Sequence, residues 1–380
     1  MEARRNKDQN IVVGITHGDY NGIGYEVILK TFSDKRMFEF STNVVYGSAS
    51  ISEFYTQNLN LPNQGLNIVK DINKLHGNKL NILSIEDNNV KVEPGKSTKK
   101  AGELAFKALE AAVKDLKNNN IDLLVTAPIN KENIQSDKFH FSGHTDYLAK
   151  AFDAKNYLML MVQQNLRIGV ITGHIPLKDV ASTINTELIT LKINVLNRSL
   201  ENDFAIRKPK IALLGLNPHA SDNGLIGNEE DDIIIPAIKK AQEEGLLVYG
   251  PYAADGFFAS ENHKNFDAIL AMYHDQGLIP FKTIAFKDGV NFTAGLPIVR
   301  TSPAHGTAYE IAGKNMASPD SFRQAIYLGL EIVKNRQLHE EINSNPLPSA
   351  LKKINSRTLQ DEDASSLREE NGEKPYGLPY

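Results

Sequence analysis

Short apolar runs, each about the length of a buried strand, recur along the chain between longer stretches with helical periodicity. A parallel sheet with helices on both faces produces this alternation, because its strands are buried on both sides. The runs are IVVGI (11–15), NVVYG (43–47), DLLVTAP (122–128), YLMLMV (157–162), RIGVITG (167–173), KIALLGL (210–216), AILAMY (268–273) and TIAF (283–286). They predict an α/β fold with mainly parallel sheets.

Two amphipathic segments carry clear start signals for helices. After Thr98, which can cap a helix, apolar residues keep to one face until the run NNN at 118–120. A second helix is predicted to begin at Ser318, with Pro319 in its first turn. Helices of this kind between the apolar runs support the same fold class.

Three histidines each follow one of the apolar runs: His174 follows RIGVITG, His219 follows KIALLGL and His274 follows AILAMY. Parallel strands end at one edge of a sheet, which is where open α/β sheets bind their ligands. A single histidine in such a place is more often a hydrogen-bonded surface residue than a ligand. Three in equivalent settings make a shared divalent metal site as plausible as three unrelated residues.

Composition narrows the class of protein. The length of 380 residues suggests about two domains, and no apolar stretch approaches the roughly 18 to 20 residues that a membrane helix needs. The segment MEARRNKDQN at the start is not a secretory signal, so a cytoplasmic protein is expected. Without cysteine, any metal must be held by nitrogen and oxygen. A net charge of −4 without long basic tracts gives no reason to expect nucleic acid.

Two loops combine glycine with polar residues. THGDYNGIGYEV (16–27) matches neither GxGxxG nor the P-loop, so we interpret it as a tight structural turn rather than a phosphate site. FSGHTDYLAK (141–150) places His144 and Thr145 at the start of a helix, where free backbone N–H groups favour an anion. An ordinary cap by Ser142 or Thr145 explains that segment equally well.

Lys282, Asn291 and Arg300 are spaced nine residues apart in the segment FKTIAFKDGVNFTAGLPIVRTS (281–302). This spacing is too wide for one helix face but can be bridged by a strand, a loop and the next strand. Lysine and arginine can neutralise a phosphate or carboxylate, and asparagine can orient it. The apolar surroundings of Arg300 argue against a merely solvated charge, because an unpaired buried guanidinium is costly.

Eight motifs follow one another along the chain: GITHGDYNGIGYEV, VTAPINKENI, FSGHTDYLA, ITGHIPLKDV, GLNPHASDNGLIGNEE, GPYAADGFF, AMYHDQGLIPFK and GVNFTAGLPIVRTSPAHGTAYEIAG. Together they closely resemble the 4-hydroxythreonine-4-phosphate dehydrogenase family of vitamin B6 synthesis, over roughly residues 11–333. The resemblance implies the two-domain α/β/α fold of isocitrate and isopropylmalate dehydrogenases. It also implies a homodimer with a shared active site.

The family oxidises 4-phosphooxy-L-threonine with NAD or NADP, and decarboxylation then leaves 3-amino-2-oxopropyl phosphate. The resemblance therefore implies a small phosphorylated substrate, a nicotinamide cofactor and one divalent metal ion (Zn, Mg, Mn or Co). Such an ion lowers the pKa of a bound alcohol and stabilises the enolate formed on decarboxylation. A single metal site can thus serve both steps.

Carried over motif by motif, the metal ligands are His174, His219 and His274, contributed by both subunits, and the substrate-binding residues are His144, Thr145, Lys282, Asn291 and Arg300. Lys282 and Asp255 are the candidate catalytic residues. Lys282 could instead pair with a substrate anion, and Asp255 could be a turn-forming residue before Gly256. His305 and Gly306 resemble the cofactor loop of the related dehydrogenases, near the adenosine half of NAD or NADP.

The chain departs from the family pattern at two places. It has HGDYN (17–21) where the family commonly has PGEPA, and Gly256 where threonine is frequent. These departures keep open a related substrate, 4-phospho-D-threonate or 4-phospho-D-erythronate. A non-catalytic metal-dependent binding protein is the alternative of another class, disfavoured because the metal, anion and cofactor motifs occur together.

The resemblance also predicts the domain organisation. Residues 1–135 with 300–353 are expected to form a first domain on the cofactor side, and residues 136–299 a second domain on the metal and dimer side. Residues 354–380 are polar and lack periodicity, which predicts a tail without a catalytic role.

Overall fold

The computed structural model describes residues 10–62, 65–85 and 90–345. Contacts divide the chain into two units, residues 1–336 and 337–380, and every strand in the described part of the chain belongs to the first unit. In the second unit only residues 337–345 are described, and they continue the last helix to Asn343. The predicted tail at 354–380 lies outside the described residues.

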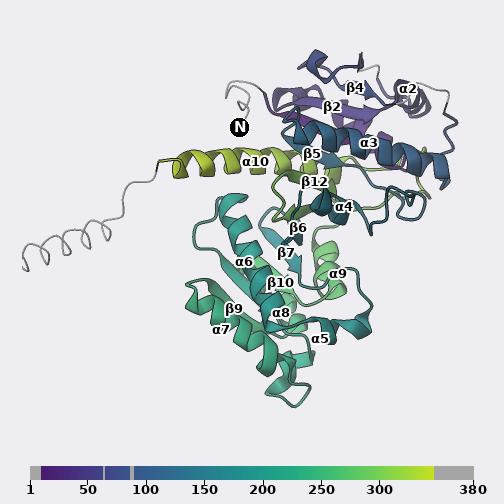
Figure 1. The fold of residues 1–380 in the computed structure, drawn as a ribbon. Coiled ribbons are helices and arrows are strands. Elements are labelled where there is room, and N and C mark those ends of the chain that lie inside the picture. Colours follow the sequence, from purple (N-terminus) through teal and green to yellow (C-terminus); the bar gives the residue numbers. More distant parts are fainter. Residues whose placement is uncertain (1–9, 63–64, 86–89, 346–380) are drawn as a thin grey trace, which may run out of the picture. The chain divides into compact units, whose positions relative to one another are not determined.

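Twelve strands in the described part of the chain form one sheet, in the order β3-β4-β2-β1-β5-β12-β11-β6-β7-β10-β8-β9 (Figure 1). Their bounds are Val12–Thr16 (β1), Thr42–Gly47 (β2), Asn67–Val69 (β3), Asn81–Ser84 (β4), Leu123–Thr126 (β5), Leu158–Gln163 (β6), Leu166–Val170 (β7), Lys210–Leu214 (β8), Leu247–Tyr252 (β9), Ala268–Ala271 (β10), Val290–Ala294 (β11) and Val299–Pro303 (β12). Neighbours pair in parallel except β12 with β11, β11 with β6 and β6 with β7. The mainly parallel α/β fold predicted from the sequence is confirmed.

The helices cover both faces of this sheet. They are Gly24–Phe32 (α1), Ala49–Asn58 (α2), Lys99–Lys117 (α3), His144–Ala151 (α4), Val180–Thr183 (α5), Thr186–Asn202 (α6), Ile235–Glu243 (α7), Ala254–Ala259 (α8), His274–Ile284 (α9) and Asp320–Asn343 (α10). Helix α3 packs on one face of β1, β2 and β5, while α1 packs on the other face. Both predicted helix starts are confirmed, since Thr98 caps α3 through a hydrogen bond from Ala101 N and α10 begins just after Pro319.

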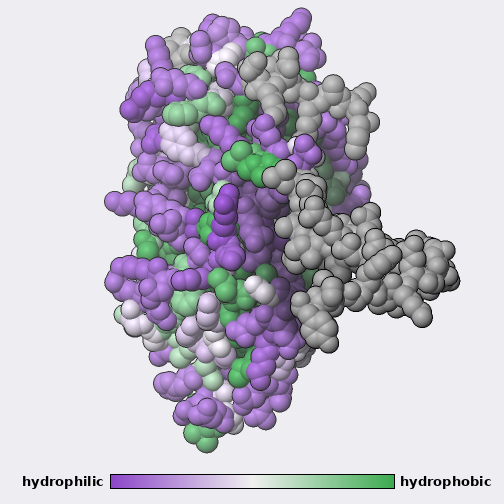
Figure 2. All heavy atoms as spheres, turned by 90° about the vertical axis from the view of Figure 1, so that its left-hand side faces the viewer, coloured by the Kyte–Doolittle hydropathy of each residue, from purple (hydrophilic) through white to green (hydrophobic). Residues whose placement is uncertain are grey.

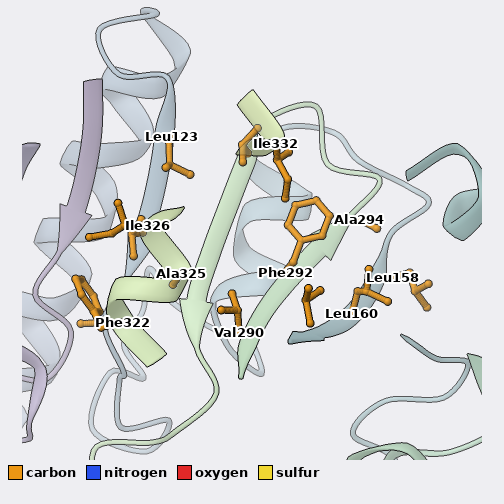
Figure 3. Close-up of a cluster of buried hydrophobic side chains, with 14 of the residues drawn as sticks. Leu123, Leu158, Leu160, Val290, Phe292, Ala294, Phe322, Ala325, Ile326 and Ile332 are labelled. Carbon is orange, nitrogen blue, oxygen red and sulfur yellow. The ribbon is translucent and has the colours of Figure 1, made fainter. Parts of the chain in front are cut away.

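The central strands β6, β11 and β12 separate an apolar core from a polar cavity. Because side chains alternate along a strand, residues such as Leu160, Phe292 and Val299 all point to one side. They belong to the same buried cluster as Phe322 and Ile326 of α10. Figure 3 labels several residues of this cluster, Leu160 and Phe292 among them. The alternate residues, Met161, Asn291 and Arg300 among them, face the cavity. The same three strands thus supply residues to both the core and the site.

One predicted strand is wrong. TIAF (283–286) is the end of α9 and the turn after it, not a strand. Leu278, Phe281 and Ala285 are buried at helical spacing against β7 and β10, so the segment belongs to an amphipathic helix. Phe286, by contrast, is 86% exposed. An apolar run of four residues has too few positions to distinguish the two periods.

The surface drawn in Figure 2 is mainly hydrophilic, with apolar side chains in scattered groups. No helix in the described part of the chain is long and apolar enough to cross a membrane. In the sheet order, β1 to β5 and β12 are contiguous, and β6 to β11 form the other half. The boundaries near residues 135 and 300 stay predictions.

Candidate active site

A cavity of about 630 Å³ lies over the polar face of the central strands. Its floor comes from β6, β7, β11 and β12, and its walls come from the segment after β5, the start of α4, the loop after β7 and one face of α9. Of the eleven predicted site residues, nine line it: His144, Thr145, His174, His274, Lys282, Asn291, Arg300, His305 and Gly306. His219 and Asp255 do not.

Arg300 is the most buried charged group of the cavity, with 3% of its surface exposed. Its Nε and Nη2 atoms donate hydrogen bonds to Thr126 Oγ1, at 3.1 and 2.7 Å. Burial lowers the pKa of the guanidinium to about 10. No carboxylate pairs with Arg300 among the residues that the structure describes. The cavity therefore contains a positive charge that an anionic ligand can neutralise.

His144 and Asn291 lie beside this arginine in the cavity wall and floor. Burial, followed by the charges of Arg300 and Lys131, lowers the pKa of His144 well below its usual value, so its imidazole is neutral. Asn291 Oδ1 is buried and has no hydrogen-bond partner within the described structure. A buried carbonyl oxygen without a donor is costly, so a ligand hydroxyl or ammonium group would stabilise this position.

Helix α4 begins at His144 without a side-chain cap. The Ser142 hydroxyl donates to the Asp146 carboxylate, and the Thr145 hydroxyl lies 3.5 Å from that of Thr293. The cap by Ser142 or Thr145 that the sequence left open is therefore not formed. The free N–H groups of the first turn remain next to the cavity, where they favour negative charge.

His174 and His274 are brought together from the ends of two neighbouring parallel strands, β7 and β10. Their ring centroids are 5.2 Å apart, and His274 Nδ1 lies 2.7 Å from Asp275 Oδ1. Partial burial, then the charges of Lys131 and His274, lower the pKa of His174. Two adjacent imidazoles, one of them oriented by a carboxylate, suit a divalent metal ion.

His219 lies away from this pair in the single chain. It is exposed in the turn after β8, where five consecutive residues, His219 to Asn223, have positive φ. Asp255 is exposed on α8, which contacts the same turn. No group of three histidine, aspartate or glutamate side chains that could hold a metal occurs within the described ranges of one chain. His219 and Asp255 thus share a surface outside the cavity.

Charged side chains in the cavity are mostly positive. Lys282 lies two helical turns after His274 and on the same face of α9. Lys131, Lys192 and Arg300 also line the cavity, and Asp146 is the one carboxylate among the described lining residues. Four cations against one carboxylate favour a ligand with more than one negative charge.

The cofactor candidates lie at the end of β12. His305 and Gly306 line the cavity, and His305 Nε2 is buried without a partner in the described structure.

The first glycine-rich loop (16–27) does not line the cavity and has a structural role, as predicted. Asp19 within it is fully buried and accepts hydrogen bonds from Asn133 Nδ2 and the Tyr309 hydroxyl, both at 2.7 Å. That loop is a structural turn.

Among the polar residues of the cavity that sequence reasoning missed are Thr126, Lys131, Asp146 and Lys192. Thr126 ends β5 and Lys131 follows soon after, so the strand-end argument used for the histidines could have found both. Lys192 gave no such signal. It belongs to α6, whose apolar residues pack on the opposite face of the sheet, and its Nζ donates to the Tyr157 carbonyl at the start of β6.

Comparison with known proteins gives the family of the chain. The model of the family described as pyridoxal phosphate biosynthetic protein PdxA matches residues 39–329. The chain belongs to the PdxA family. A 4-hydroxythreonine-4-phosphate dehydrogenase from Bacteroides thetaiotaomicron is 50% identical over 342 residues, covering 90% of this chain and 94% of the relative.

Two further relatives carry different enzyme names. The crystal structure of a 4-hydroxythreonine-4-phosphate dehydrogenase from Klebsiella pneumoniae superposes with a TM-score of 0.75 at 33% identity, covering 85% of this chain and all of that one (100%). A relative from Oceanobacillus iheyensis that carries a D-threonate 4-phosphate dehydrogenase name is 34% identical over 329 residues, with 86% and 98% coverage. Both names thus occur among relatives of this PdxA-family chain.

Proposed function

We propose that this protein is an NAD(P)-dependent dehydrogenase that oxidises and decarboxylates 4-phosphooxy-L-threonine, giving 3-amino-2-oxopropyl phosphate for pyridoxal phosphate synthesis. One observation carries the proposal: a pair of adjacent imidazoles, His174 and His274, shares a cavity with four cations and one carboxylate. The substrate has a hydroxyl to be oxidised, which a metal ion at the imidazoles would bind. Its phosphate and carboxylate match the cations. The 50% identical relative has the corresponding name.

The cationic groups of the cavity bind the phosphate and the carboxylate of the substrate. The buried Arg300 and the first turn of α4 offer donors to the phosphate, and the neutral His144 can donate a further hydrogen bond to it. Asn291 Oδ1 is free to accept from the substrate ammonium or hydroxyl group. These contacts orient the carbon that loses hydride toward the nicotinamide.

His174 and His274 fit a divalent metal ion, because their two rings are adjacent and the lowered pKa of His174 favours the unprotonated form that binds a metal. When bound, such an ion lowers the pKa of the substrate hydroxyl and stabilises negative charge on the oxygen during decarboxylation. Lys282 places an ammonium group on the same helix face as His274. There it can bind the substrate carboxylate and give a proton to the carbon from which that carboxylate departs.

We further propose that the site is completed by a second copy of the chain. His219 is exposed and outside the cavity of its own chain, and Asp255 lies on α8 against the same turn. A homodimer would bring His219 of the partner subunit to the imidazole pair as the third ligand. Asp255 would arrive with it, so both residues would serve the neighbouring site rather than their own.

The nicotinamide cofactor is proposed to bind along the loop after β12, at His305 and Gly306. A side chain at Gly306 would meet no neighbouring atom within 4 Å, so this backbone is open to a ligand. The unpartnered His305 Nε2 can hydrogen-bond to it. The choice between NAD and NADP is left to experiment.

Formation of reduced nicotinamide, followed by absorbance, tests the proposal. The protein is assayed with 4-phosphooxy-L-threonine, 4-phospho-D-threonate and 4-phospho-D-erythronate in parallel, each with NAD or NADP and a divalent metal. Preference for the L-threonine ester is the expected result. Preference for a D-acid would favour the second candidate function, which the Oceanobacillus relative supports. No turnover on any of the three would overturn the enzyme assignment.

A further inference from the structure

Thr126 lies next to Arg300 because of the register of two parallel strands. Arg300 on β12 pairs with Leu124 on β5, so Thr126 is its diagonal neighbour, two residues further along. Residues two apart on a strand share a face, which puts the threonine side chain on the cavity side with the guanidinium. Thr126 is itself fully buried, at 0% exposure.

The hydrogen bonds between these two residues use one edge of the guanidinium. Nε and Nη2 both donate to Thr126 Oγ1, at 3.1 and 2.7 Å. No protein group among the described residues accepts a hydrogen bond from Nη1. The outer edge, Nη1 with the second hydrogen of Nη2, is the edge that binds an oxyanion in a bidentate manner.

The chemistry of the acceptor matters as much as its position. A buried arginine is usually held by a carboxylate, which also cancels its charge. A threonine hydroxyl holds the same edge but is neutral. Within the described structure no ion pair involves Arg300, so its charge is fully available in the cavity.

We propose that Thr126 is a positioning residue that fixes Arg300 through its hydroxyl and leaves the outer edge and the full charge of the guanidinium for an oxyanion of the ligand. Naming the phosphate ester of the substrate as the ligand depends on the function proposed above. The binding of an oxyanion by Arg300 does not depend on that function, and it can be measured without turnover.

Three variants separate the parts of this proposal. Thr126→Val keeps the shape and removes the acceptor, Thr126→Ser keeps the hydroxyl, and Thr126→Asp holds the arginine while cancelling its charge. Thr16→Val is the matched control. Thr16 pairs directly with Thr126 on the neighbouring strand β1 and is also buried, but its Oγ1 has no partner in the described structure.

Calorimetry with inorganic phosphate as the probe gives the first readout. We expect Thr126→Val to weaken phosphate binding by about tenfold or more, which is the scale of one hydrogen bond to a charged group. Thr126→Ser should restore affinity to near that of the unmodified protein, and Thr126→Asp should be as weak as Thr126→Val. The control should bind phosphate like the unmodified protein.

Steady-state kinetics gives the second readout. Thr126→Val should raise KM for the phosphorylated substrate with little change in kcat, because the lost contact serves binding. Equal affinity and KM in all variants would overturn the proposal, as would a serine variant as weak as the valine one. If Thr126→Val does not fold, wild-type affinity in Thr126→Asp overturns it instead. Hydroxyl-dependent phosphate binding without turnover on any substrate would leave the inference standing and reject the dehydrogenase.

Discussion

The two sides of the cavity are completed to different degrees by one chain. On the side of β5, β11 and β12, Arg300, Thr126 and Asn291 lie on regular strands and are buried or half-buried, and Arg300 donates two hydrogen bonds to Thr126. On the β7 and β10 side, His174 and His274 follow strand ends and are exposed or partly exposed. The third predicted ligand, His219, is elsewhere.

The two sides differ in what positions their side chains. Strand register fixes the anion side, because adjacent strands hold their side chains at set spacings whatever the ligand does. The metal side depends on loops and, as we propose, on a second chain. We therefore expect the anion side to be preformed in the monomer and the metal side to require assembly.

The largest expected effect is on the metal side. His174→Ala removes one of the two imidazoles in the cavity, and we expect kcat/KM to fall by about 10³-fold or more, since metal assistance contributes several kcal/mol to such reactions. Metal affinity should fall with it, while phosphate affinity stays unchanged. His339→Ala is the control, because that histidine is exposed in the C-terminal part of α10. Wild-type activity at limiting metal concentration would contradict the assignment.

Subunit complementation follows as the next largest effect. His174→Ala and His219→Ala should each be inactive, yet a mixture allowed to exchange subunits should recover about a quarter of wild-type activity. Half of the dimers are then hybrids, and one of the two sites in each hybrid has all three ligands. Subunit exchange is verified by mass spectrometry of differently tagged chains. No recovery despite exchange would show that the third ligand does not come from the partner.

A smaller effect is expected on the anion side. Arg300→Met keeps much of the apolar stem but removes the charge, and KM for the phosphorylated substrate should rise by about 100-fold, as for loss of a buried charged hydrogen bond. Metal affinity, measured by calorimetry, should not change. A parallel fall in metal affinity would mean that the two sides are coupled and that the comparison drawn above fails.

The smallest effect concerns stability and comes from His17, which lies outside the cavity. Burial lowers its pKa from 6.5 to about 4, so the unfolded chain binds a proton that the folded chain does not. Stability from this group is present above the unfolded pKa and is lost as the pH falls toward the folded one. We expect the free energy of unfolding to fall by about 2 kcal/mol between about pH 7.5 and pH 5.

Urea unfolding of the wild type and of His17→Gln at these two pH values measures this contribution. The variant should be less stable at neutral pH because a packed ring is lost, but it should lack this part of the acid-induced loss. The same pH dependence in both proteins would show that His17 does not carry it. Preformation of the anion side should not depend on this group, so phosphate affinity serves as the internal control.

Part of the site was predictable because its residues follow apolar strands: His174 and His274 come after β7 and β10, and both line the cavity. Other predicted residues that line it, His305 and Gly306 among them, came from the family resemblance. The TIAF segment was predicted as a strand because a short apolar run fits either a strand or a helix. Lys192 could not be found at all, since it reaches the cavity from a helix packed on the opposite face.

By itself, the sequence determined the fold class and the family of this protein, because hydrophobic periodicity and local motifs are properties of neighbouring residues. The pairing of Thr126 with Arg300 and the separation of His219 from the other histidines were decided only by tertiary structure. Both depend on which strands become neighbours and in which register. Contacts between residues 174 positions apart in the chain leave no local pattern from which they could be predicted.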